Sequence, residues 1–163
     1  MAQLALVSDN LHFLQHLLPT WEQQFDLRVL NPPKPPPRIR GPRDLLAGLR
    51  NRRLRSRELP PLAEWADVVF CEWATHYLEW LSHHPGRAKL ATRMHRYELE
   101  RHADRVNWDN VALVLFVSDA MERAFRAAVP DYGGQTAVVY ENIDFAKFSP
   151  PPRGKSGDRP AGE

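Results

Sequence analysis

Apolar residues in this chain are gathered into six short runs that alternate with stretches of helical spacing. The runs cover Gln3–Ser8, Asp26–Leu30, Asp67–Cys71, Lys89–Met94, Ala112–Val117 and Thr136–Tyr140. Short apolar runs of this kind predict buried strands, and strands that alternate with helices predict a parallel sheet joined by crossover helices. We therefore expect an α/β fold built on a parallel sheet of about six strands flanked by helices.

Proline positions shape the helices that the sequence predicts. The first helix follows Asp9-Asn10, and Pro19 is expected to kink it or to end it early. A second helix begins at Pro42, where proline is tolerated in the first turn, and Pro60-Pro61 are expected to separate it from a short turn. The remaining helices are predicted at Ala74–Ser82, residues 96–105 and Ala120–Ala128.

Length and composition are those of one globular domain. The chain has 163 residues, of which 43% are hydrophobic and 26% are charged. We place the domain at residues 1–148 and expect residues 149–163, which lack apolar periodicity, to be a disordered tail or a linker. The single cysteine, Cys71, allows no disulfide within the chain, and neither a signal peptide nor a membrane-spanning stretch is seen. These features are typical of a cytoplasmic protein.

Residues 32–57 form a basic, proline-rich insertion. They carry a net charge of +8 in a chain whose total is +2, so the remaining residues carry −6. One interpretation is a surface loop followed by a solvated helix face; another is peripheral docking to anionic lipid, helped by Leu45, Leu46 and Leu49 on the opposite face. Nucleic acid is not expected, because aromatic residues do not alternate with the basic ones. The arginines available to lipid are Arg38, Arg40, Arg43, Arg50, Arg52, Arg53, Arg55 and Arg57.

Polar or aromatic residues follow most of the predicted strands, although a buried strand does not need them. Ligands of parallel sheets bind beyond the carboxyl ends of the strands. The candidate ligand-contacting residues are therefore those at the strand ends: Asp9, Asn10, Glu72, Trp73, His95, Arg96 and Glu98.

Each candidate also has a purely structural interpretation. A neutral imidazole at His95 can accept and donate hydrogen bonds to a sugar hydroxyl, or it can cap a helix together with Glu98. Arg96 can bind a phosphate, or it can pair with Glu98 or Glu100. The ring of Trp73 can hold a sugar or pack in the core, and Asp9 can contact acceptor hydroxyls or cap a helix.

Motifs for several other chemistries are missing. The sequence has neither the GxGxxG pattern of dinucleotide sites nor the GxxxxGK[ST] phosphate loop, and it lacks the GxSxG motif of serine hydrolases. His12 and His16 lie four residues apart, but no third zinc ligand is evident. We therefore expect no metal and no bound cofactor.

Four segments carry a resemblance to a known family: WADVVFCEW, KLATRMHRYE, NVALVLFVSDAMERAF and TAVVYENIDFAKFSP. From Trp65 to Pro150 their order resembles the N-terminal, acceptor-side domain of retaining GT-B glycosyltransferases of the group 1, or family-4, type. The last segment is similar to the family's strand followed by Pro-Asn-Gly-Val-Asp. Those five positions are occupied here by Tyr140, Glu141, Asn142, Ile143 and Asp144.

The resemblance implies a Rossmann-like domain that forms one half of a GT-B fold. It implies transfer of a sugar, with retention, from a nucleotide-sugar donor substrate to a hydroxyl acceptor, with His95 as the catalytic contact beside the transferred sugar. A C-terminal donor-binding domain, in cis or in trans, is the implied partner, and the chain alone is expected to be inactive. Two departures are the absence of glycine in Ser8–His12 and an end where that second domain would begin.

A competing hypothesis comes from a different class of protein. The chain would then be a standalone, non-enzymatic Rossmann-like module that binds a protein partner or an anionic membrane through its arginine-rich segment. Restored sugar transfer on mixing with a donor domain would separate the two hypotheses.

Overall fold

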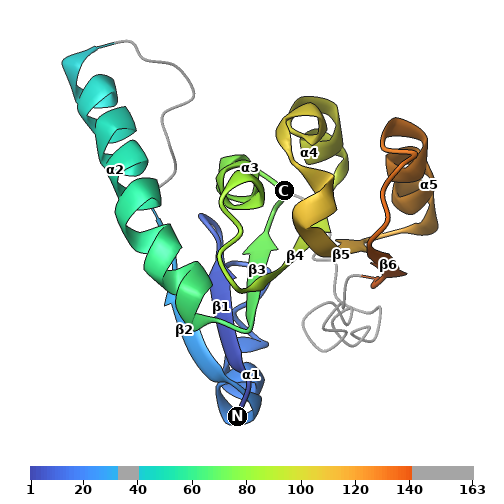
Figure 1. The fold of residues 1–163 in the computed structure, drawn as a ribbon, viewed down its shortest axis with the longest axis horizontal. Helices are drawn as coiled ribbons and strands as arrows, with labels where there is room; N and C mark the ends of the chain where they lie inside the picture. Colours follow the sequence, from blue (N-terminus) through green and yellow to red (C-terminus); the bar gives the residue numbers. More distant parts are fainter. Residues whose placement is uncertain (33–40, 141–163) are drawn as a thin grey trace, which may run out of the picture.

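The computed structural model describes residues 1–32 and 41–140, and over these residues the chain forms one sheet with helices packed against it (Figure 1). The strands are β1 (Gln3–Val7), β2 (Asp26–Leu30), β3 (Val68–Glu72), β4 (Lys89–Met94), β5 (Val111–Phe116) and β6 (Gln135–Val138). Their order is β2-β1-β3-β4-β5-β6, and every neighbouring pair is parallel. The predicted Rossmann-like α/β fold is confirmed.

Five α-helices and two single-turn 3₁₀ helices connect the strands in the described residues. They are α1 (Leu18–Gln24), α2 (Pro42–Trp65), α3 (His76–His83), α4 (Arg96–Arg101), η1 (Ala103–Arg105), η2 (Trp108–Asn110) and α5 (Asp119–Ala128). Helices α2 to α5 follow one another along one face of the sheet, with α3 between α2 and α4 (Figure 1). No helix in the described part of the chain combines the length and the apolar character that a bilayer crossing requires.

Both faces of the sheet are buried, which explains why the strands are apolar runs without strict alternation. The larger core lies between the sheet and α2 to α5, where Leu78, Leu81, Phe116 and Phe125 are fully buried. On the other face Leu6 packs against the segment of residues 11–21.

Helix α2 runs without a break through Pro60 and Pro61, so the predicted separation at these prolines was wrong. A proline inside a helix removes a backbone hydrogen bond and costs about 3 kcal/mol or more. The helix continues because Leu59 and Ala63, on either side of the prolines, are fully buried in the core. Burial of the C-terminal half of α2 outweighs the local preference of the two prolines.

Helix α1 begins later than the sequence predicted. Residues 11–17 form turns, for example through a hydrogen bond from Gln15 N to Leu11 O, and the helix starts at Leu18 with Pro19 in its first turn. Proline has no N–H to lose in that turn, so it favours a helix start rather than a kink. The polar helix predicted for residues 96–105 is likewise divided into α4 and η1.

Some predictions concern residues outside the described ranges. These are the tail of residues 149–163, the match of residues 141–144 to the family motif, and the contributions of Arg38 and Arg40 to a basic surface.

Candidate functional site

The carboxyl ends of β1, β3 and β4 lie side by side at one edge of the sheet. Because the three strands are parallel and adjacent, the residues that follow them share this edge. The strand order reverses at β1, because β2 lies on one side of it and β3 on the other, and ligands of open α/β sheets bind at such switch points. The structure thus brings Asp9, Glu72 and His95 to one edge, as the parallel arrangement predicted.

Two aromatic rings stack at this edge. The ring centroids of Trp73 and His95 lie 4.3 Å apart with 24° between the ring planes. The ring centroid of Phe13, which is exposed, lies 6.0 Å from that of Trp73. The indole Nε1 of Trp73 is buried and has no hydrogen-bond partner within the described residues.

Trp73 also has an unusual backbone conformation. Its φ of 72° lies in the left-handed region, and no other described residue except glycine has a positive φ. A residue with a β-carbon is strained there by about 1–2 kcal/mol, and such strain is concentrated at binding and active sites. The strained conformation turns the chain sharply at the end of β3.

His95 has the helix-capping role that was one of its two interpretations. Its backbone N donates to Oε2 of Glu98 at 2.7 Å, and α4 begins at the next residue. Glu98 is fully buried, and burial raises the pKa of its carboxyl group, while the hydrogen bond from His95 opposes that rise. The cap holds the His95 ring in place beside Trp73.

Glu72 is engaged with Arg93, a residue that sequence analysis did not single out. The Nε of Arg93 lies 3.0 and 3.2 Å from the two carboxylate oxygens of Glu72, and Nη2 contacts Oε1 as well. The side chain of Glu72 is fully buried and that of Arg93 is 13% exposed. Only the strand register, which sets Glu72 opposite Arg93, reveals this pair. The pair links β3 to β4, and Glu72 immediately precedes Trp73 of the aromatic stack.

The other predicted ligand contacts that the structure describes, Asn10 and Arg96, form only local hydrogen bonds and ion pairs. Asn10 forms a turn, in which its N–H donates to Ser8 Oγ at 3.0 Å and its Oδ1 accepts from His12 N at 3.2 Å. Arg96 is exposed and pairs with Glu100 at 2.8 Å, which was its structural interpretation. A phosphate contact by Arg96 stays a prediction.

Polar side chains of α2 and α3 reach the same edge from the helix-covered face. Helix α2 leads into the start of β3 and packs against α3, so its N-terminal half lies toward the carboxyl ends of the strands (Figure 1). Asn51 and Tyr77 are buried there. Sequence analysis missed Asn51, although it lies in one row with Arg55, Leu59 and Ala63 at four-residue spacing, a signal that it faces inward.

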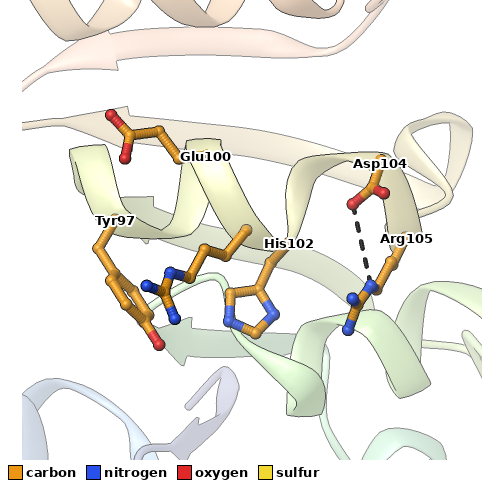
Figure 2. A pocket seen from close by; sticks show the side chains of 6 residues that line it. Tyr97, Glu100, His102, Asp104 and Arg105 are labelled. Atoms are coloured by element: carbon orange, nitrogen blue, oxygen red, sulfur yellow. Dashed lines mark ion pairs between the residues drawn. The ribbon is translucent and has the colours of Figure 1, made fainter.

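A shallow depression of about 460 Å³ lies elsewhere, on α4 and η1 (Figure 2). The guanidinium of Arg101 lies over the ring of Tyr97 at 4.8 Å, and Nδ1 of His102 is 2.5 Å from Glu79 Oε1. Its lining residues are Tyr97, Glu100, Arg101, His102, Asp104 and Arg105. None of the predicted ligand contacts lines this depression, so the site remains the strand-end edge.

Comparison of the chain with protein-family models, with curated proteins and with solved structures found no match. In the part of the chain that the structure covers, no three His, Cys, Asp or Glu side chains are placed to share a metal ion. Burial raises the pKa of the Cys71 thiol to about 12, so this residue is no nucleophile.

Proposed function

We propose that this chain is the acceptor-side domain of a retaining GT-B glycosyltransferase. With a donor-binding domain in cis or in trans, it would transfer a sugar from a nucleotide-sugar to a hydroxyl acceptor. The observation that carries the proposal is the Trp73–His95 stack at the carboxyl ends of β3 and β4, next to the switch point at β1. The resemblance of residues 65–150 to that family supports it independently.

Each residue of the edge has a defined role in this proposal. The rings of Trp73 and His95 form an apolar surface for a sugar ring, and the imidazole exchanges hydrogen bonds with a hydroxyl of the transferred sugar. Asp9 accepts a hydrogen bond from the acceptor. Glu72 acts through Arg93: its buried carboxylate is already bound, so it positions the stack and does not touch substrate. Closure of the second domain would exclude water from this edge.

The test is sugar transfer by the chain mixed with, or fused to, a donor-binding domain. Nucleotide release and product formation are measured over a panel of nucleotide-sugars. His95→Ala should lower turnover by about a hundredfold or more with little change in thermal stability, whereas His16→Ala, an exposed control, should change neither. Equal losses of stability and turnover would make His95 a structural residue. No transfer from any donor would reject the glycosyltransferase proposal.

A second candidate function is docking to an anionic membrane. Leu45, Leu46 and Leu49 are 50, 65 and 54% exposed near the start of α2, which extends beyond the sheet (Figure 1). Arg50 and Arg53 are exposed on the same half of the helix, so the leucines can insert while the arginines meet lipid phosphates.

Vesicle sedimentation tests this surface directly. The chain should bind vesicles of phosphatidylcholine and phosphatidylserine, but not phosphatidylcholine alone, and added salt should release it. The variant Leu46→Ser should weaken binding, while Val29→Ser, at an exposed position outside α2, should not. Salt-insensitive binding, or none, would exclude docking by this helix.

A further inference from the structure

Buried polar atoms without a hydrogen-bond partner are rare in folded proteins, and this chain gathers several at one place. They are Oδ1 of Asn51 and Nε of Arg55 on α2, Nε2 of His76 and Oη of Tyr77 on α3, and Oε1 of Glu98 on α4, none of which has a partner within residues 1–32 and 41–140. The residues Asn51, Tyr77 and Glu98 are only 3, 2 and 0% exposed. We call these five residues the polar cluster.

The rings of His76 and Tyr77 lie 4.1 Å apart on α3, and α3 packs against α2, which carries Asn51 and Arg55. The charge of Arg55 acts on both His76 and Tyr77, and the charge of Asp9 acts on both Tyr77 and Glu98. Asp9 follows β1, so the cluster lies toward the carboxyl end of the strand at which the sheet order reverses. It lies on the face covered by α2, α3 and α4, opposite the face of the Glu72 side chain.

Helix α2 explains how polar groups come to be buried here. Asn51, Arg55, Leu59 and Ala63 form one row at four-residue spacing. The two residues nearer the start of β3 are apolar and pack in the core, while the two nearer the carboxyl edge are polar. The row changes from core packing to polar groups where the sheet reaches its ligand-binding edge.

The cluster contains both donors and acceptors. Burial raises the pKa of Tyr77 to about 12, so its hydroxyl stays protonated, and burial together with the charge of Arg55 lowers the pKa of His76 to about 4, so its imidazole stays neutral. Arg55 adds a donor and Glu98 an acceptor, and the charges of Arg55 and Asp9, which are opposite in sign, both act on Tyr77. Hydroxyl groups, which donate and accept at once, fit this mixture better than a phosphate does.

We propose that the polar cluster binds the hydroxyl groups of an uncharged carbohydrate. This inference rests on the proposed function, because it makes the acceptor of sugar transfer itself a sugar. The ligand enters past Asp9, Arg55 and Trp73, which are partly exposed at the edge. A buried polar group without a hydrogen-bond partner lowers the free energy of unfolding of the free protein. Removing such a group should therefore weaken ligand binding without lowering the stability of the protein.

The experiment titrates the full chain with the methyl α- and β-glycosides of glucose, galactose and mannose, and follows binding by saturation-transfer NMR. Tyr77→Phe removes only a hydroxyl, and loss of its hydrogen bond should weaken the best glycoside by about tenfold. Asn51→Leu should weaken it similarly. Both variants should melt at or above the temperature of the wild type. Arg57→Met, on the exposed side of the same helix, should bind as the wild type does.

Four results would overturn the proposal. They are no binding of any neutral glycoside; affinities of Tyr77→Phe and Asn51→Leu within about twofold of the wild type; tighter binding of inorganic phosphate or glucuronate; and a lower melting temperature in both variants. Glycoside binding without transfer in the two-domain mixture would keep the cluster and reject the glycosyltransferase. Transfer to a non-sugar acceptor, with no glycoside bound, would do the reverse.

Discussion

The Glu72–Arg93 pair offers the sharpest test of how the edge is held together. Glu72→Gln preserves the shape of the side chain and removes its charge, which leaves the guanidinium of Arg93 without a counter-charge. Breaking a buried pair by removing one partner costs 3–5 kcal/mol. We expect about 3 kcal/mol, the low end of that range, because Arg93 keeps some contact with solvent.

The assay is urea and thermal unfolding followed by circular dichroism. A loss of about 3 kcal/mol should lower the melting temperature by about 6–12 °C in a domain of this size. Glu100→Gln, which breaks the exposed pair with Arg96, is the matched control and should leave the melting temperature unchanged.

Two outcomes would refute this reasoning. A cost below about 1 kcal/mol for Glu72→Gln would mean that the pair contributes no more than an ordinary surface contact. A double variant, Glu72→Leu with Arg93→Leu, should recover much of the loss, because an apolar pair of similar volume needs no counter-charge. If the double variant is as unstable as Glu72→Gln, the ion pair is not the cause.

Three further predictions concern single residues. The thiol of Cys71, buried and with its pKa raised to about 12, should react with iodoacetamide only after unfolding; reaction of the folded protein at neutral pH would contradict this. Burial first, and then Arg55, lowers the pKa of His76 from 6.5 to about 4, so the unfolded chain binds the proton more readily and stability should fall as the pH drops from 6.5 toward 4. That fall should be smaller in His76→Phe, and an identical pH profile would refute the assignment. Ser118 Oγ accepts from Met121 N at the start of α5, so Ser118→Ala should cost about 1 kcal/mol in urea unfolding while Ser118→Asp should not; equal stabilities would exclude the cap.

The strands were predictable because both faces of the sheet are covered. Burial on both sides produces apolar runs that stand out in the sequence, and β2 and β4 begin and end at the predicted residues. The course of helix α2 was harder to predict, because the rule that proline interrupts a helix considers only the local sequence around Pro60 and Pro61. The burial of Leu59 and Ala63 that overrides the rule exists only in the folded chain.

The position of the candidate site was predictable, but its internal contacts were not. Parallel strands put their carboxyl ends at one edge, which was enough to place Asp9 and His95 at the same edge. Arg93 looked like an ordinary strand residue, because its pairing with Glu72 depends on register. Arg55 looked like one more cation of a solvated segment, because its inward direction depends on how α2 is rotated against the core.

The uninterrupted course of α2 has a mechanical consequence. Proline carries no N–H, so the carbonyls of Ser56 and Arg57 receive no helical hydrogen bond from residues 60 and 61. The turn that lacks these two hydrogen bonds lies between the C-terminal part of α2, which is buried in the core, and the N-terminal part, which carries Asn51. The part of α2 that lies over the strand ends is therefore joined to the part in the core through a turn that lacks two helical hydrogen bonds.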